Sequence, residues 1–450
     1  MMNFMHFEIP VLRKKDVIVI GGGCAGISAA VSAARHGSDV LLVEKNGFLG
    51  GMATAGLIGP FMTCFDPEGK RQVIKGVFEE FVQRMIALGG AIHPAKIEAG
   101  SSYAGYRVYG HAHCGPFNPE CFKIVAEQMC VENNVELLYN ATFVATVLNE
   151  TKDSIKGVVL ATKAGLIQVD ADIVIDCSGD ADVAYQSGVP FCYGDDEGKT
   201  QPGSMFFTIK GIDKSKLEQV RTESGDFTSI FFQKLINEEI NSGRYSVPRN
   251  KFAVYENPDG TFRVNMSRVY LKDGCDPFEI TKASIESRGQ ITEIISLMRR
   301  LIPGCENVEL VDSAAALGLR ETRRIQGDFV LKGEDILNKR KFDDVIFLAG
   351  NSIDMHNGNA VSYITAEGEP YQIPYRILLP KKISNLLVAG RCCSLDRVAL
   401  AAIRVMPPVF AMGQAAGTAA ALCVQDGHRV AEVDIKKLQN CLIQDGAVLE

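Results

Sequence analysis

Three glycines near the N-terminus have the spacing that holds a pyrophosphate. Gly21, Gly23 and Gly26 fit the pattern G-x-G-x-x-G in the run Gly21-Gly22-Gly23-Cys24-Ala25-Gly26. The first glycine makes a tight turn, the second lets the backbone approach the phosphates, and the third lets helix and strand pack closely. Glu44, followed by Lys45, stands about 20 residues further along, where a carboxylate binds ribose hydroxyls. The pattern predicts a dinucleotide site.

A second glycine-rich loop follows directly and distinguishes between dinucleotides. The segment GFLGGMATAG contributes Gly50, Gly51, Met52, Ala53 and Thr54. Its backbone can run along a ribityl chain and a pyrophosphate, whereas a plain nicotinamide domain has no use for such a loop. We therefore expect FAD, held noncovalently because residues 48–56 contain no histidine.

Residues near the C-terminus are expected to close in the flavin. Gln414 and Ala415 lie in the run Gly413 to Gly417, near the predicted start of a helix. The N–H groups and dipole of a helix start can stabilise negative charge on the reduced flavin pyrimidine.

Asp354 and His356 are the first candidates for catalysis. They follow an apolar strand predicted over residues 345–349, and we place them on the loop after its end, where catalytic groups often lie. Histidine is a natural general base for taking a hydroxyl proton while hydride leaves for flavin N5. An ordinary structural histidine is the alternative. His111 and His113 form a second, less favoured pair.

Several arginines are candidates for holding a substrate. Arg320, Arg323 and Arg324 surround Glu321, and this group is either a fork for a substrate carboxylate or hydroxyls, or an ion-pair cluster that joins two domains. Arg404 lies within an apolar run, so its charge needs a partner or a cavity. Flavin or substrate is one such partner.

The elements that must position these residues can be predicted from periodicity. Residues 16–20, 25–35 and 39–43 read as one strand–helix–strand unit. Helices are predicted over 77–88 and 119–132, and residues 135–177 alternate with period two, as in a β-meander between two strands. Short strands and a long helix over 277–301 follow, and a strand at 385–390 with a helix over 409–424 returns to the Rossmann pattern.

These elements predict an α/β fold in two domains. A Rossmann-like FAD-binding domain of glutathione-reductase type comprises residues 1–190 and 376–450, and an inserted α+β cap or substrate domain comprises residues 191–375. At 450 residues the chain exceeds the size at which a single core remains efficient.

Several ordered blocks of the chain resemble the FAD-dependent oxidoreductase family. They are GGGCAGISAA, GFLGGMATAG, DCSGDADVA, LGLRETRRIQGD, YQIPYRILLP and the segment from NLLVAGRCCS to QAAGTAAA. That family is related to glutathione-reductase-type flavoproteins and, more distantly, to the flavoprotein subunit of heterodisulfide reductase. The resemblance implies phosphate contacts at Gly21, Gly23, Ala25 and Gly26, ribose contact at Glu44, and flavin or ribityl contacts at residues 50–54. It also implies contacts at Val144, Gly179, Gly390, Arg391, Gln414 and Ala415.

Composition excludes several other classes of protein. The net charge is −7 and the pI about 5.7, so we expect no nucleic-acid partner. The most apolar stretches are broken by glycines, Arg404 and Pro407-Pro408, so we expect no membrane span, and no export signal is recognised. The 13 cysteines contain no C-x-x-C pair, so we expect neither a redox dithiol nor a metal site, and we place the protein in the cytoplasm.

The sequence therefore predicts an FAD-dependent oxidoreductase. It would transfer a hydride between flavin N5 and a small polar organic substrate, either a hydroxylated ring or sugar-like compound or an activated C=C bond. A separate electron acceptor or donor is required, and a homo-oligomer is compatible with the sequence. The alternative is a non-redox flavoprotein, an isomerase or RNA-modifying protein, that uses FAD structurally or electrostatically.

Overall fold

The apolar run that precedes the first glycines forms an inner strand of a seven-stranded sheet. The computed structural model describes residues 8–107, 112–224, 228–357, 360–364 and 367–450, and its main sheet has the strand order β3-β2-β1-β6-β5-β4, with β17 also paired to β6. Strands β1, β2, β3, β6 and β17 are parallel, whereas β4, β5 and β6 are antiparallel neighbours. The strands are β1 (Val11–Ile20), β2 (Val40–Val43), β3 (Glu136–Leu138), β4 (Thr142–Leu148), β5 (Ile155–Thr162), β6 (Gly165–Asp176) and β17 (Leu386–Val388).

Both faces of the parallel part of the sheet are buried. Side chains alternate between the two faces of a strand. Val17 and Val19 of β1 enter one apolar core, while Ile18 and Ile20 enter another with residues of β5 and β6. A parallel strand buried on both faces reads as a continuous apolar run, as this one does.

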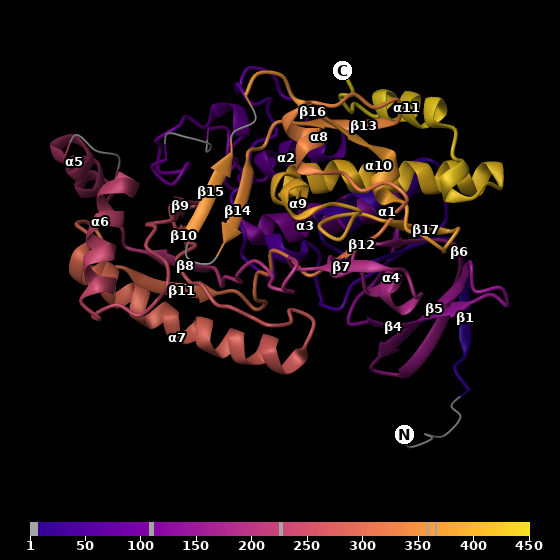
Figure 1. Ribbon diagram of the computed structural model, residues 1–450, viewed down its shortest axis with the longest axis horizontal. Coiled ribbons are helices and arrows are strands. Elements are labelled where there is room, and N and C mark those ends of the chain that lie inside the picture. The colour runs from indigo at the N-terminus through magenta and orange to yellow at the C-terminus, as the bar shows by residue number, and fades with distance from the viewer. Residues whose placement is uncertain (1–7, 108–111, 225–227, 358–359, 365–366) are drawn as a thin grey trace.

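Helices cover one face of this sheet, with α1 packed directly against α10 near the middle (Figure 1). Gly413 and Gly417 make this close approach possible, because a Cβ atom on them would lie 2.2 Å from Ala25 O and 2.1 Å from Ala29 O. The helices of this part are α1 (Cys24–Arg35), α2 (Val77–Ala87), α3 (Pro119–Glu132), α10 (Met406–Asp426) and α11 (Ile435–Gln444).

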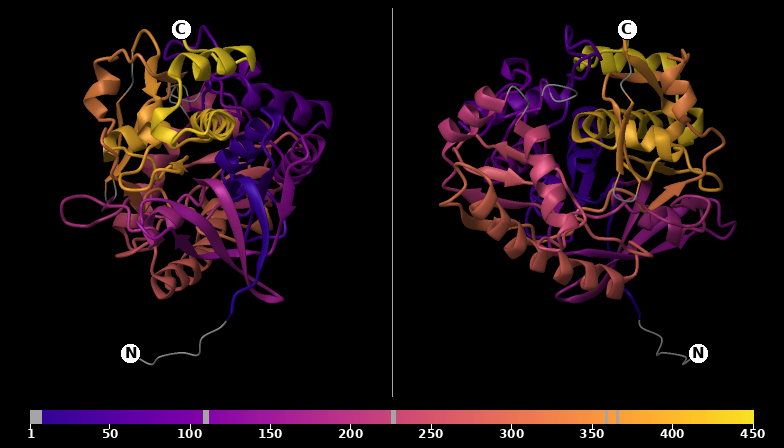
Figure 2. Two further views of the ribbon diagram at one scale, coloured as in Figure 1. Left: turned by 90° about the vertical axis from the view of Figure 1, so that its right-hand side faces the viewer. Right: turned by 60° about the vertical axis from the view of Figure 1, so that its left-hand side comes forward.

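A second, smaller sheet lies on the other side of the molecule. Its strand order is β11-β8-β10-β9, and α7 runs along its outer side (Figures 1 and 2). The elements are β8 (Phe207–Lys210), α5 (Lys214–Ser224), α6 (Thr228–Asn241), β9 (Val254–Glu256), β10 (Phe262–Val264), α7 (Pro277–Leu301) and β11 (Glu309–Ser313). They enclose their own apolar core, so the chain has a second packing centre besides that of the main sheet.

The remaining elements are short. Strand pairs are formed by β7 (Phe191–Tyr193) with β12 (Arg323–Ile325), β13 (Val345–Ala349) with β16 (Tyr371–Pro374), and β14 (Ile353–Asn357) with β15 (Ala360–Ile364). The short helices are α4 (Asp182–Gln186), α8 (Gly333–Leu337) and α9 (Arg397–Ile403), with 3-10 turns at Gly51–Ala53, Pro94–Lys96, Tyr375–Leu378 and Val430–Glu432.

The packing differs from the predicted extent of the cap, residues 191–375. Apolar residues of the second core end at Leu317, whereas Leu331, Ile346, Tyr371 and other residues of this stretch belong to the first core. The pair β13–β16 explains the difference, because both strands bury apolar side chains against the helix layer of the first part. The division of the chain into domains itself stays a prediction.

Among the residues that the structure describes, one helix is long and apolar enough to span a membrane. It is α10, and 83% of its most apolar 18-residue window is buried inside the protein.

Candidate active site

A cleft runs along the ends of the parallel strands and contains about 1280 Å³ of empty space, including the solvent at its mouth. Both glycine-rich loops line it, together with Glu44, Lys45 and the turn after β17. In open α/β sheets, ligands bind outside the carboxyl ends of the strands. The cleft therefore lies where a Rossmann-type protein binds its dinucleotide.

The first glycine loop has the geometry that phosphate binding requires. A Cβ on Gly21 would lie 2.5 Å from Cys177 O, and one on Gly26 only 1.8 Å from Gly21 O, so both positions need glycine for chain packing. A Cβ on Gly23 would meet nothing nearer than Gly51 Cα at 3.9 Å. Gly23 thus borders open space at the start of α1, where backbone N–H groups can reach phosphate oxygens.

Glu44 is held rigidly at the end of β2. Its Oε2 accepts a hydrogen bond from Gly22 N at 2.7 Å, and its Oε1 accepts from Asn46 N at 2.9 Å. The carboxylate is buried and lines the cleft, so it is positioned for ribose hydroxyls.

The second glycine loop lies against the first. Gly50 has φ +112° and pairs with Gly23 in a parallel bridge, and a Cβ on Gly51 would lie 2.9 Å from Gly23 Cα. Gly390 also borders the cleft, with φ +115° and Ala25 Cβ 3.9 Å from where its own Cβ would lie, and the buried Nε of Arg391 has no hydrogen-bond partner among the described residues. A dinucleotide with a long ribityl arm fits these walls, and this orphaned nitrogen is available to hold it.

Most of the predicted cofactor residues line this cleft. They are Gly21, Gly23, Cys24, Ala25, Glu44, Lys45, Gly50, Gly51, Met52, Ala53, Gly179, Gly390 and Arg391. Three others support the walls instead. Gly22 N binds Glu44, Gly26 packs on Gly21, and the Thr54 hydroxyl donates to Leu49 O at 2.9 Å.

Three predicted contacts differ from the geometry. Val144 is an exposed residue of β4, and the neighbouring Thr142 and Phe143 line the cleft instead. Gln414 and Ala415 lie a full two turns inside α10, which begins at Met406 rather than near residue 409. Gln414 accepts a hydrogen bond from Val77 N at 3.1 Å, so it binds α2, and Met406 and Val409 border the cleft.

Sequence reasoning missed an ion pair in the cleft. Asp180 accepts from Arg391 at 2.5 Å and from the Thr322 hydroxyl at 2.7 Å. Burial opposes the charge of Asp180, but the arginine and these hydrogen bonds hold its pKa below the usual value. Asp180 lies within the block DCSGDADVA, which carried part of the family resemblance, so that block was the available signal.

A second cavity, hereafter the substrate cavity, adjoins the cleft. Met52, Arg391, Arg404 and Met406 line both. The substrate cavity lies between the two parts of the molecule, since Phe206 and Tyr255 of the second core also line it. All four predicted catalytic residues border it, namely Arg320, Asp354, His356 and Arg404.

Asp354 and His356 lie on a strand, β14, and not on the predicted loop. Residues two apart on a strand share a face, and here the Nε2 of His356 lies 3.1 Å from Asp354 Oδ2. The other ring nitrogen, Nδ1, lies 3.1 Å from the Nη2 of Arg268. Arginine can only donate, so Nδ1 accepts and Nε2 carries the proton that is donated to Asp354.

The charges around this pair set its protonation. Burial and the charge of Arg320 lower the pKa of His356 to about 3. Burial opposes ionisation of Asp354, but the hydrogen bond from His356 and the charges of Arg404 and Arg320 hold its pKa well below its usual value. At neutral pH the pair is a neutral imidazole beside an ionised carboxylate, and the imidazole has no free lone pair for a substrate proton. This geometry disagrees with His356 as the general base.

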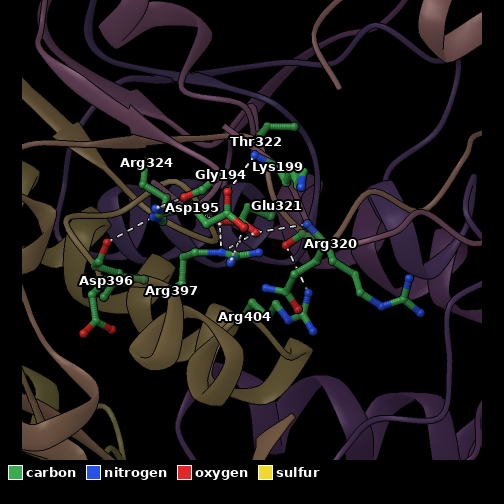
Figure 3. A network of polar contacts seen from close by, with 12 residues as sticks. Gly194, Asp195, Lys199, Arg320, Glu321, Thr322, Arg324, Asp396, Arg397 and Arg404 are labelled. Carbon is green, nitrogen blue, oxygen red and sulfur yellow. Dashed lines mark hydrogen bonds and ion pairs between the residues drawn. The ribbon is translucent and has the colours of Figure 1, made fainter. Parts of the chain in front are cut away.

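The arginines around Glu321 separate into two groups (Figure 3). Arg324 and Arg397 pair with the buried Glu321, while Arg323 pairs with Asp182 at 3.0 Å. Glu321, Arg324 and Arg397 therefore form an ion-pair cluster, and Arg323 has a separate ion-pair partner, so these arginines do not form a fork for a substrate. Arg320 points away from it, with Nη2 donating to Ser204 Oγ at 2.9 Å. Arg404 donates to Arg320 O at 3.2 Å and to Asp354 O at 3.0 Å, so Arg320 and Arg404 face the substrate cavity.

The second histidine pair lies elsewhere. The ring of His113 stacks on Phe65 with centroids 4.2 Å apart, and neither of these residues borders the two cavities. His111 lies outside the described residues.

A Rossmann-type sheet, two glycine loops and a ribose-binding carboxylate define a dinucleotide-binding protein. The family model described as "FAD dependent oxidoreductase" matches residues 16–442, so the chain belongs to the FAD-dependent oxidoreductase family. The protein is therefore an FAD-dependent oxidoreductase, and its cofactor is FAD.

Individual relatives are similar over shorter stretches or in fold alone. The chain is 27% identical over 192 residues to a fumarate reductase (cytochrome) of Shewanella frigidimarina, which is 36% of this chain and 33% of that protein. It is 49% identical over 47 residues to cinnamate reductase of Clostridium sporogenes, 10% of this chain and 7% of that protein. The chain thus matches no more than about a third of either relative's length.

Solved structures of similar outline include p-nitrophenol 4-monooxygenase from Pseudomonas putida. That structure has a TM-score of 0.48 at 12% identity and covers 96% of this chain and 85% of its own. A geranylgeranyl bacteriochlorophyll reductase-like protein from Thermoplasma acidophilum has a TM-score of 0.47 at 12% identity, with 97% and 84% covered. At these TM-scores the likenesses add nothing to what the family match establishes.

Proposed function

We propose that this enzyme transfers a hydride between flavin N5 and a small polar organic molecule bound in the substrate cavity. The observation that carries the proposal is the junction of the two cavities at Met52, Arg391, Arg404 and Met406. A molecule in the substrate cavity would lie beside the part of the cleft that these four residues line. When bound, FAD supplies a ring that takes or gives a hydride.

The chain's own residues would divide the remaining work. Asp354 is an ionised carboxylate on the cavity wall, so it can accept a hydrogen bond or a proton from a substrate hydroxyl. His356 would act as a positioning residue, because its Nε2–H holds Asp354 while Arg268 fixes its tautomer. Arg320 and Arg404 would anchor polar groups of the substrate.

The fold supports a finer architectural proposal. The antiparallel strands β4 and β5 would be the meander of a glutathione-reductase-type FAD domain, and residues 205–317, which supply most of the second core, would be its inserted substrate domain. The electron donor or acceptor would be a separate partner, and we propose a cytoplasmic location.

The experiment is an anaerobic titration of the FAD-loaded protein. Polyols, sugars and hydroxy acids are added to the oxidised protein, and compounds with activated C=C bonds to the chemically reduced protein, while flavin absorbance is followed. We expect one class to bleach or restore the flavin bands, with a primary isotope effect when the reacting carbon carries deuterium. Product formed with no change in flavin absorbance would contradict hydride transfer.

A further inference from the structure

The substrate cavity carries a large excess of positive charge. Its lining includes six cationic side chains, Arg107, Arg249, Lys251, Arg320, Arg391 and Arg404, against one carboxylate, that of Asp354. Arg391 is paired with Asp180, but the ion pairs of the described residues include none for Arg249, Lys251 or Arg320. The partners of the Arg320 guanidinium are neutral, the Ser204 hydroxyl and Pro202 O.

Arg249 is the most unusual of these cations. It lies in the segment that joins α6 to β9 and is only 5% exposed. Its Nε and Nη1 are buried and have no hydrogen-bond partner among the described residues. Burying a charge is costly unless it is paired and hydrogen-bonded, so two unused donors at a cavity wall indicate a site built for an acceptor.

The neighbours of Arg249 strengthen this reading. Burial and the charges of Arg268 and Arg107 lower the pKa of Arg249 to about 10. Burial and the charges of Arg107 and Arg249 lower the pKa of Lys251 to about 8. These cations repel one another in the described structure, and a bound anion would relieve that repulsion.

The rest of the lining limits the kind of anion. Apolar side chains, among them Ile58, Phe206 and Leu319, make up another part of the wall and suit a carbon skeleton. The carboxylate of Asp354 in the same cavity repels two charges concentrated on one phosphate group more strongly than charges carried singly on separate carboxylates. A guanidinium also matches the geometry of a carboxylate with two parallel hydrogen bonds.

We propose that the substrate is a small organic carboxylate, and that Arg249 is the buried anchor of its carboxylate group. This inference rests on the proposed function, because it specifies the molecule that the substrate cavity holds. It adds Arg249 and Lys251 to the site, neither of which the sequence pattern singles out. Arg320, in the segment between β11 and β12, would complete the anion site.

The test measures binding without turnover. Malonate is titrated by calorimetry into the oxidised FAD-loaded enzyme, with malonamide at equal ionic strength as its neutral counterpart. Malonate has a single methylene between its carboxylates, so it cannot form a C=C bond by losing hydride. Its binding therefore survives a failure of the hydride-transfer proposal. We expect malonate to bind at least tenfold more tightly than malonamide.

Two variants locate the site. Arg249→Met removes the charge at similar size, and we expect it to weaken malonate binding roughly 10- to 150-fold, the range for a lost hydrogen bond to a charged group. Arg249→Lys keeps the charge but cannot form two parallel hydrogen bonds to a carboxylate. Its malonate affinity should therefore lie between those of the parent and of Arg249→Met. Arg288→Met, at an exposed position on α7, is the matched control and should bind as the parent does. Absorbance reports the FAD content of each variant.

The outcomes are decisive in either direction. Unpaired buried Arg249 costs stability in the ligand-free state, so Arg249→Met should fold and have a raised melting temperature. If it fails to fold, thermal stabilisation of the parent by malonate, but not by malonamide, still supports the anion site. Equal binding of malonate and malonamide, unchanged binding by the Arg249 variants, or tighter binding of inorganic phosphate than of malonate would overturn the proposal.

Discussion

At the scale of single residues, the chemistry of the site depends on which groups already have partners. Asp354 and His356 were expected on one loop, and they lie instead on one strand with their side chains 3.1 Å apart. Arg268, however, is 88 positions away from His356 and donates to the nitrogen that a general base would need. No spacing in the sequence could show this contact, because it arises from packing β14 against the second part of the chain.

The different roles of Asp354 and His356 can be separated by substitution. Asp354→Asn should slow flavin reduction by substrate about 100-fold or more, as expected for loss of a general base. His356→Gln should slow it only about tenfold, because glutamine can still donate to Asp354, and should shift the pH profile of the rate. The measurement is stopped-flow flavin absorbance under anaerobic conditions, with FAD content as the control. A larger loss in His356→Gln than in Asp354→Asn would restore His356 as the base.

His356 also makes stability depend on pH. Its pKa is about 3 in the folded protein against an ordinary value of 6.5, because burial and Arg320 disfavour its charged form. Below pH 6.5 the unfolded chain takes up a proton at this histidine that the folded protein does not. The contribution of His356 to the free energy of unfolding is therefore complete above pH 6.5 and is lost as the pH decreases toward 3. We expect a contribution of up to about 1.4 kcal/mol per pH unit. Denaturant unfolding at pH 7 and pH 5 should show a smaller decrease in the free energy of unfolding for His356→Gln than for the parent. Equal decreases in the two proteins would be evidence against a buried neutral ring.

Lys251 should make anion binding depend on pH on the alkaline side of neutrality. Its ammonium group faces the charges of Arg107, Arg249, Arg268 and Asp354, and its pKa is about 8. An anion favours the protonated form, so malonate affinity should decrease as pH rises through about 8. Calorimetry at pH 7 and pH 9 measures the change, and Lys251→Met should abolish most of it. A parent affinity that does not vary between these pH values would exclude Lys251 from the site.

At the scale of elements, the contact between α1 and α10 links the cofactor cleft to the C-terminal segment. A Cβ on Gly413 would lie 2.2 Å from Ala25 O, and Ala25 lines the cleft. A Cβ on Gly417 would lie 2.1 Å from Ala29 O, which is further from the cleft along α1. Replacing either glycine with alanine would therefore crowd α1 to a similar degree, at a site next to the cleft for Gly413 and further from it for Gly417.

Substitution of these glycines should separate packing from cofactor binding. Gly413→Ala and Gly417→Ala should each destabilise the protein by about 1–3 kcal/mol, the usual cost of overpacking. Gly413→Ala should also weaken FAD binding, because it displaces Ala25. Gly289→Ala on α7, where a Cβ meets nothing within 4 Å, is the control and should be neutral or stabilising. Thermal unfolding and FAD titration measure both effects, and equal loss of FAD affinity in the two helix variants would contradict this assignment.

The sequence predicted elements well where local patterns determine them. Helices α3 and α7 begin at a proline that follows an Asn or Asp cap, and both occupy the predicted residues. The predictions differ where tertiary pairing decides. Residues 135–177 were expected as a β-meander between two strands, but pairing with both β1 and β5 joins the last meander strand and the strand after it into one continuous strand, β6. Likewise β14 is a strand only because β15 pairs with it.

The same distinction holds for the site. Glycines of the first loop, Glu44 and the residues around Gly390 carry local signals, and they line the cleft. Gln414 was expected near the start of a helix, but that helix begins eight residues earlier, at Met406. Arg249 carries no local signal, since its importance comes from a cavity formed by distant segments and from the absence of a partner for two of its nitrogens among the described residues.

At the scale of the whole molecule, the cleft joins segments that are far apart in the chain. Its walls come from both glycine loops, from Thr142 and Phe143, from Gly179 and Asp180, and from Gly390 to Val409, with Ala316 next to the second core. A ligand in this cleft contacts all of them at once. FAD should therefore stabilise the assembled fold and not one element alone.

Removal of FAD should lower the melting temperature of the entire first part of the molecule. A ligand that binds only the folded state stabilises it by about 2.7 kcal/mol at a free concentration 100 times its Kd, so the midpoint should rise as free FAD is increased. Glu44→Gln should reduce this rise, because it removes the charge that orients Gly22 N and Asn46 N and that faces the ribose. Glu369→Gln, at an exposed position, is the matched control. The measurement is thermal unfolding of the FAD-free and reconstituted proteins. A midpoint that does not respond to FAD concentration would mean that the cleft is not what holds these segments together.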